Sequence, residues 1–188
     1  MLLRIDYYGG YEVEFVNELE KQPKPCGADR LVILAYASEV ANEWQLTPGC
    51  DVERFVNERL PGKIENSPVS NAHEKASIEV KKGGEFSITL FPSLLPLPLH
   101  RRMLIAHELG HLVLHSRYGE RAVLANCATE NEGEKAEREA YDFADGFLVP
   151  RGSLHKAQEK FDNDIIQIAA HFMVPESVVR RRMADIGG

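Results

Sequence analysis

Two histidines and a glutamate stand at a spacing that can hold and use a metal ion. His107, Glu108 and His111 form the pattern His-Glu-x-x-His. On an α-helix, residues four apart lie about one turn from each other on the same face, so both imidazoles can bind one Zn²⁺. Glu108 can then act on a water molecule at the metal. The pattern predicts zinc-dependent hydrolysis; the competing interpretation is a core helix with two hydrogen-bonded histidines.

The residues around this pattern favour a buried helix. Most of them are apolar: Met103, Leu104, Ala106, Leu109, Leu112, Val113 and Leu114. A helix of this composition packs into a protein core, because too few polar residues remain to face water. We therefore expect the candidate site to have rigid walls and to contain little water.

A catalytic zinc site needs a third protein ligand and an open position. Residues from about Glu134 to Leu148 predict a second helix, whose buried face comprises Ala140, Phe143, Ala144, Phe147 and Leu148. Glu137 shares a face with small residues of that helix, so we expect it to point toward the core, where a metal would offset the cost of its charge. Glu139 is the alternative ligand.

His115 lies one further turn along the first helix. On a straight helix it stands about 12 Å in rise from His107, which is too far for both to share one ion with His111. We expect a structural role for His115, or a contact with a ligand histidine. Hydrolysis also needs a hydrogen-bond donor for the developing oxyanion. Tyr141, Tyr118 and His115 are the candidates, and the sequence does not choose between them.

The remaining patterns predict the framework of the site. Helices are expected from about residue 29 to 44 and from 52 to 60, followed by a polar loop at 63–75. Alternating apolar residues at 77–80 and 86–90, on either side of a Gly-Gly turn, indicate a β-hairpin. We expect the strand at 86–90 to pair with an extended substrate.

Three stretches of the chain resemble the ImmA/IrrE family of metallopeptidases. Residues Arg102–His115 are similar to the central helix of the family. Residues Glu137–Pro150 resemble its second motif, a Glu followed by Ala, Phe-Ala and an apolar pair before Pro. The tail at Ile168–Pro175, with Val179 and Arg182, resembles the short helical pair that follows.

The resemblance implies that Glu137 is the third zinc ligand and that the fold is like that of the thermolysin-type zinc peptidases. We therefore expect an α+β protein: a mostly helical zincin-like domain with a small mixed β-sheet and a C-terminal helical, helix-turn-helix-like tail. Residues 1–62 would form an N-terminal helical segment that packs on the core, 63–150 the peptidase core and 151–188 the C-terminal subdomain. One departure is Tyr141, where family members often have Asn or Asp.

The resemblance also implies a regulatory endopeptidase of narrow specificity, with Zn²⁺ as cofactor. Its substrate would be a helix-turn-helix repressor or an antitoxin, often in the control of transcription on a mobile element. The net charge of −7 argues against a nucleic-acid partner. Three widely spaced cysteines and the lack of an 18-residue apolar run predict a cytoplasmic protein without a membrane span.

The alternative function is a zinc-containing regulatory binding module with little or no proteolytic activity. Arg180, Arg181 and Arg182 form a basic run in the tail that motivates a protein or DNA partner. The same run is also expected at a solvated helix end, where its charge favours the helix dipole.

Overall fold

A computed structural model describes residues 24–69, 75–81, 83–92, 98–116, 123–124 and 130–187. Its elements, in chain order, are α1 (Arg30–Glu43), α2 (Val52–Arg59), β1 (Gly62–Asn66), β2 (Ala76–Val80), β3 (Phe86–Leu90), α3 (Pro98–Gly110), η1 (His111–His115), β4 (Val123–Leu124), α4 (Glu130–Leu148), α5 (Arg151–Lys160), α6 (Ile165–Phe172) and α7 (Glu176–Gly187). Helices predominate and the sheet is small, which confirms the expected α+β class.

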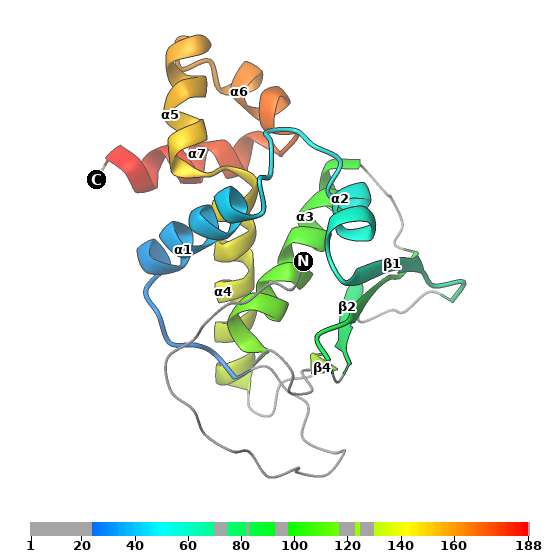
Figure 1. The fold of residues 1–188 in the computed structure, drawn as a ribbon. Helices are drawn as coiled ribbons and strands as arrows, with labels where there is room; N and C mark the ends of the chain where they lie inside the picture. The colour runs from blue at the N-terminus through cyan, green and yellow to red at the C-terminus, as the bar shows by residue number, and fades with distance from the viewer. Residues whose placement is uncertain are drawn as a thin grey trace.

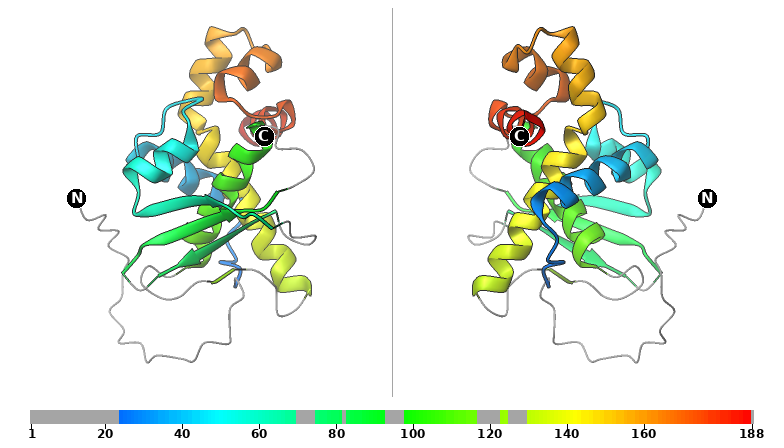
Figure 2. Two further views of the ribbon diagram at one scale, coloured as in Figure 1. Left: turned by 90° about the vertical axis from the view of Figure 1, so that its right-hand side faces the viewer. Right: turned by 90° about the vertical axis from the view of Figure 1, so that its left-hand side faces the viewer.

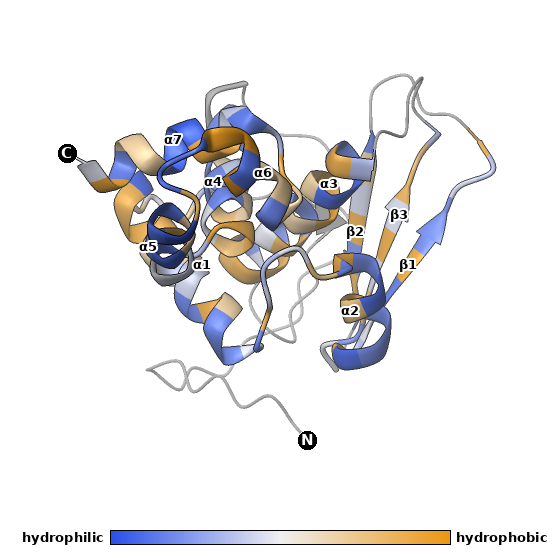
Figure 3. Cartoon of the chain, turned by 90° about the horizontal axis from the view of Figure 1, so that it is seen from above, coloured by the Kyte–Doolittle hydropathy of each residue, from blue (hydrophilic) through white to orange (hydrophobic). Residues whose placement is uncertain are grey.

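Most of the helices lie on one side of the molecule and the strands on the other, with α2 beside β1 (Figure 1). Seen from above, α1, α4 and the C-terminal helices group on one side and β1, β2 and β3 on the other, with α3 between them (Figure 3). Two further views show α5 and α6 at the end of α4 that lies away from the sheet (Figure 2). The helix α3 therefore stands where the sheet and the helical layer meet.

The sheet is mixed and has the strand order β1-β3-β2-β4. Strands β2 and β3 form the predicted antiparallel hairpin, in which Ile78 pairs with Ile88. Strand β4 adds to β2 in antiparallel orientation, and β1 adds to β3 in parallel orientation. Along β3 the side chains alternate between buried and half-buried, as a strand with one covered face requires.

Residues 62–66 form strand β1, so the predicted loop at 63–75 is wrong in its first part. Lys63 and Glu65 are exposed at this sheet edge, and Ile64 is the one large apolar residue, so a single apolar position is too little for the sequence to mark a strand. Because β1 and β2 flank β3 on its two sides, the prediction that strand 86–90 pairs with a substrate is also wrong.

Helix α4 is the central element of the helical layer, and it packs closely against α1. A Cβ atom on Gly146 would lie 2.8 Å from the carbonyl oxygen of Leu34 and 2.9 Å from the Cβ of Ala37. The predicted face of α4 is confirmed, since Ala140, Phe143, Ala144, Phe147 and Leu148 are all buried. Helix α4 begins at Glu130, four residues before the expected start.

Helix α3 carries His107 and Glu108 and continues into the wide π-helical turn η1, which begins at His111. The backbone N–H of Ser116 donates to the carbonyl of His111 at 3.1 Å, which spans five residues. Where α3 crosses α4, a Cβ atom on Gly110 would lie 2.9 Å from the carbonyl oxygen of Ala140. The absence of a side chain at residue 110 therefore lets the two helices approach closely.

The C-terminal helix α7 is fastened to α4 by arginines. Arg181 donates two hydrogen bonds, of 2.8 and 2.9 Å, to the buried carboxylate of Asp145. Arg182 is buried and donates to the carbonyl of Val149 at 3.2 Å. Arg180, which pairs with Glu176, and Arg181 both keep exposed side chains, so the expected solvated arginine run holds for these two and fails for the buried Arg182.

None of the described helices combines the length and apolar character needed to cross a bilayer. Cys26 and Cys50 are free thiols, and Cys127 lies outside the described residues. The division of the chain at residues 62 and 150 stays a prediction.

Candidate metal centre

Side chains from two helices converge at one point between α3 and α4. His107 Nε2 lies 3.0 Å from His111 Nε2. Glu137 Oε2 lies 3.1 Å from His107 Nε2, and Glu137 Oε1 lies 3.1 Å from His111 Nε2. The carboxylate thus faces both imidazoles at once. The three residues offer one ligand atom each, and these atoms lie within 4.8 Å of one another.

The helices position these groups by simple geometry. His107 and His111 are four residues apart, so they share a face, and their rings meet edge to face with centroids 4.6 Å apart. Gly110 and Ala140 are in contact where the helices cross. Glu137 precedes Ala140 by one helical turn, which brings its carboxylate to the histidine face.

The three residues fit a zinc ion. Zinc–ligand bonds of about 2.0–2.1 Å at tetrahedral angles place ligand atoms roughly 3.3 Å apart. The two imidazole nitrogens are 3.0 Å apart, and a carboxylate oxygen lies 3.1 Å from each of them, a few tenths of an ångström from that spacing. Two imidazoles and one carboxylate are also a ligand set that zinc accepts in catalytic sites. Both histidines are buried, whereas the Glu137 side chain is 46% exposed, so the centre opens toward solvent on one side.

The charges around the centre suit metal binding. Burial alone would raise the pKa of Glu137, but the two neighbouring imidazoles outweigh it and hold that pKa well below its ordinary value. Burial lowers the pKa of His111, against the opposing effect of Glu137. The carboxylate is therefore ionised and the imidazole favours its neutral form, which are the states that bind a cation.

Glu108 and Tyr141 lie close to the ligand set. Glu108 is buried on α3 beside His107. The Tyr141 ring lies 4.2 Å from the His107 ring, measured between centroids, and the residue is 48% exposed. Burial raises the Tyr141 pKa, and the negative charges of Glu137 and Glu108 raise it further. Tyr141 therefore keeps its hydroxyl proton at neutral pH and can donate a hydrogen bond.

The two candidate glutamates occupy different surroundings. Glu139 Oε2 lies 3.0 Å from His115 Nε2, away from the two ligand histidines, and only 5% of its side chain is exposed. The expectation that Glu137 points into the core is therefore wrong: Glu139 is the buried carboxylate and Glu137 is the one that meets the histidine pair. A helical face can be assigned from the sequence, but which side of it stays open to water depends on the neighbouring elements.

Glu139 has a further set of contacts that the sequence did not indicate. Its carboxylate accepts hydrogen bonds from the backbone N–H groups of Cys26, at 2.7 Å, and Gly27, at 3.0 Å. Burial alone would raise the Glu139 pKa, but the hydrogen bonds from His115, Cys26 and Gly27 lower it below its ordinary value. More than a hundred residues separate the partners, so no local pattern could have revealed this link.

The structure separates the three candidate oxyanion donors. Tyr141 stands beside the centre, as described above. His115 is fully buried, and both of its ring nitrogens are engaged, by His111 at 3.0 Å and by Glu139 at 3.0 Å. It is therefore not available to a substrate. Tyr118 lies outside the described residues.

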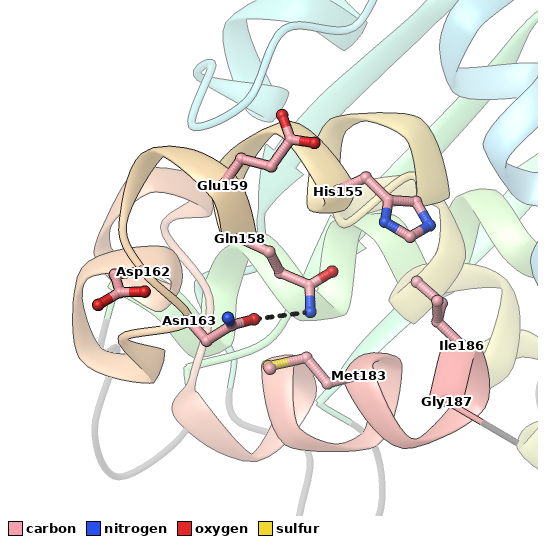
Figure 4. A pocket seen from close by; sticks show the side chains of 8 residues that line it. All are labelled: His155, Gln158, Glu159, Asp162, Asn163, Met183, Ile186 and Gly187. Atoms are coloured by element: carbon pink, nitrogen blue, oxygen red, sulfur yellow. Dashed lines mark hydrogen bonds between the residues drawn. The ribbon is translucent and has the colours of Figure 1, made fainter.

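A cavity of about 320 Å³ lies elsewhere, between α5 and α7 (Figure 4). Gln158 Nε2 donates to Asn163 Oδ1 at 3.1 Å beside it. The cavity is lined by His155, Gln158, Glu159, Asp162, Asn163, Met183, Ile186 and Gly187. None of these residues belongs to the His-His-Glu cluster. The cavity is therefore separate from the candidate metal centre.

Parts of the chain are similar to known proteins in sequence or in fold. Residues 97–184 match the family described as the IrrE N-terminal-like domain. A stretch of 91 residues is 35% identical to the metallopeptidase ImmA of Bacillus subtilis (strain 168), and it covers 47% of this chain and 52% of that protein. A solved Mycobacterium tuberculosis transcriptional regulator has the same fold, with a TM-score of 0.56 and 19% identity over 81% of this chain and 46% of that chain. The chain thus spans about half the length of each relative.

Proposed function

The chain belongs to the ImmA/IrrE family, and on that premise we propose that it is a zinc-dependent endopeptidase. His107, His111 and Glu137 would hold the zinc ion. The observation that carries the proposal is the convergence of these ligand atoms within 4.8 Å of one another, next to the buried Glu108. An isolated core helix with two hydrogen-bonded histidines would have no need of the facing carboxylate on α4.

A zinc ion in this place would make water acidic enough to react near neutral pH and would polarise the carbonyl of the peptide bond. Glu108 would accept the proton of the attacking water and deliver it to the amine when the C–N bond breaks. Tyr141 would donate its hydroxyl hydrogen bond to the carbonyl oxygen as negative charge develops there.

The substrate in this proposal is another protein. The exposed side of Glu137 leaves room for an extended chain to reach the centre. From the family resemblance we propose a helix-turn-helix repressor or an antitoxin, cleaved with narrow specificity in the control of transcription on a mobile element. Such a substrate implies that the enzyme acts in the cytoplasm.

The variant Glu108→Gln tests the reaction. It retains the size of the side chain but cannot accept the proton, so we expect zinc binding to persist and cleavage of a purified candidate repressor or antitoxin to fall by roughly 10²–10⁴-fold. The matched control is Glu134→Gln, which changes an exposed carboxylate on α4. Undiminished cleavage by Glu108→Gln would rule out the proposed mechanism.

The alternative, a zinc-containing binding module, now has weaker support. Arg182 is buried and donates to the Val149 carbonyl, so it offers nothing to a DNA or protein partner. Arg181 is paired with Asp145, although 49% of its side chain is exposed, so it offers less free charge than the sequence indicates. A charge reversal at Arg181 would break the contact with Asp145 and could not be interpreted as loss of a partner contact. Arg180→Glu is the cleaner variant, and we expect no DNA binding to be lost in it, even at low salt.

A further inference from the structure

A continuous series of hydrogen-bonded groups connects the metal centre to the segment before α1. His111 Nδ1 lies 3.0 Å from His115 Nδ1. His115 Nε2 lies 3.0 Å from Glu139 Oε2. The same carboxylate accepts the backbone N–H groups of Cys26 and Gly27. The series therefore runs from the ring nitrogen of His111 that faces away from Glu137 to residues that lie 112 positions or more before Glu139.

The direction of each hydrogen bond follows from the chemistry of the groups. Two backbone N–H groups can only donate, so Glu139 accepts on both oxygens and acts as a carboxylate. A carboxylate has no proton to give, so His115 Nε2 must donate to it. In a neutral imidazole the other nitrogen is then an acceptor, so His115 Nδ1 can receive the N–H of His111 Nδ1. Glu137 Oε1 lies 3.1 Å from His111 Nε2 and competes for the same proton until a metal occupies Nε2.

We propose that Glu139 and His115 are positioning residues that hold the His111 ring through its Nδ1, with Nε2 directed at the metal. This inference rests on the proposed metal centre and adds to it. A metal-bound histidine commonly donates its other N–H to an acceptor that fixes the ring, and such acceptors typically account for 10–100-fold in metal affinity. Here the acceptor is a second histidine, which the carboxylate orients in turn.

Burial makes this series of hydrogen bonds specific. The side chain of His115 is fully buried and that of Glu139 is 5% exposed, so water cannot readily replace either partner. Gly27 adopts φ +75°, a left-handed conformation, at the point where two successive backbone N–H groups meet the carboxylate. The segment before α1 is therefore tied to the orientation of a metal ligand.

The tautomer of His111 provides a direct test. We would record the ring nitrogen signals of His111 by NMR in metal-free protein that carries Glu137→Ala, alone and combined with His115→Leu or His115→Gln, because Glu137 otherwise competes for the proton at Nε2. Gln can accept from His111 and donate to Glu139, whereas Leu can do neither. In that background we expect the proton on Nδ1 with His115 or with His115→Gln, and loss of this preference with His115→Leu. With Glu137 present, His115→Leu should bind zinc 10–100-fold more weakly than the wild type. A His115→Leu substitution that changed neither the tautomer nor the zinc affinity would overturn the proposal.

Hydrogen exchange tests the end of the series at Cys26 and Gly27. If the ordered series of hydrogen bonds favours metal binding, metal binding must in turn favour the ordered series. Metal should therefore slow exchange of the Cys26 and Gly27 amides in the wild type, but not in His115→Leu. Equal slowing in both proteins would also overturn the proposal. The tautomer is read without metal and without a substrate, so these results are independent of the Glu108→Gln test: loss of the peptidase proposal would leave the tautomer result standing.

Discussion

Gly110 lies directly against Ala140, so that a Cβ atom at residue 110 would stand 2.9 Å from the Ala140 carbonyl oxygen and 3.1 Å from its Cα. His111 follows Gly110 in the chain, and Glu137 precedes Ala140 by about one helical turn. The contact between Gly110 and Ala140 therefore lies next to ligand residues of both helices. The contact therefore sets the separation of the two helices that supply the proposed zinc ligands.

Replacing Gly110 with Ala should destabilise the protein and weaken zinc binding. In an exposed helix this change gains up to about 1 kcal/mol, but here the added methyl group meets backbone atoms that must move, which typically costs 1–3 kcal/mol. The free energy of unfolding from urea denaturation measures the first effect, and zinc titration the second. Gly152→Ala is the matched control, because nothing lies within 4 Å of a Cβ atom at that position in α5. If both variants were equally stable, the close approach at Gly110 would not matter.

Tyr141→Phe should lower catalysis without altering the metal centre. Removal of a single oxyanion donor typically lowers kcat by about 10²–10³-fold. The ring that packs beside His107 is retained, so we expect the melting temperature and the zinc affinity of the variant to match those of the wild type. Steady-state kinetics on a protein substrate gives the answer, and an unchanged kcat would remove Tyr141 from the mechanism.

Arg181→Ala should destabilise the attachment of α7 to α4. Asp145 is buried, and loss of Arg181 leaves it with Arg30 at 3.4 Å as an ion-pair partner. Leaving a buried carboxylate poorly paired costs about 1–3 kcal/mol. Arg180→Ala removes only an exposed pair with Glu176 and should change stability by less than about 0.5 kcal/mol. Comparable losses in the two variants, measured by urea denaturation, would contradict this assignment.

The stability of the metal-free protein should fall as the pH drops from 7 to 5. Burial lowers the pKa of both His111 and His115 below the ordinary value of 6.5. The unfolded chain therefore binds more protons than the folded chain in this range, and the free energy of unfolding rises with pH. His115→Gln removes one of the two groups, so its stability should depend less steeply on pH. Urea denaturation at several pH values, with a chelator present, measures this dependence. If the free energy of unfolding changed with pH equally in the wild type and in His115→Gln, the prediction would be contradicted.

Much of the helical framework could be predicted because the signals are local. Two periodic patterns predict buried helical faces. One is the i, i+4 spacing of His107 and His111, and the other is the spacing of small and aromatic residues in α4. The hairpin of β2 and β3 follows from alternating apolar residues around glycines. Local chemistry was enough for these elements.

Contacts between distant parts of the chain were not visible in the same way. Strand β1 is mostly polar and exposed, and it is a strand because it pairs with the free edge of β3. The residues of β1 alone do not predict this pairing. Glu139 was an alternative ligand in the sequence because it lies one helical turn from Phe143. Its backbone partners at Cys26 and Gly27 precede it by more than a hundred residues, so no local pattern excluded it. The choice between two carboxylates on one helix therefore depended on tertiary structure.

Zinc titration of wild type, Glu137→Ala and Glu134→Ala tests the central claim most directly. We predict one zinc ion per chain in the wild type and in Glu134→Ala, whose substitution lies on an exposed part of α4. Loss of a direct ligand in Glu137→Ala should weaken binding by more than the roughly 100-fold that outer partners account for. A Glu137→Ala protein that binds one zinc ion as tightly as the wild type would contradict the proposed His107, His111 and Glu137 centre.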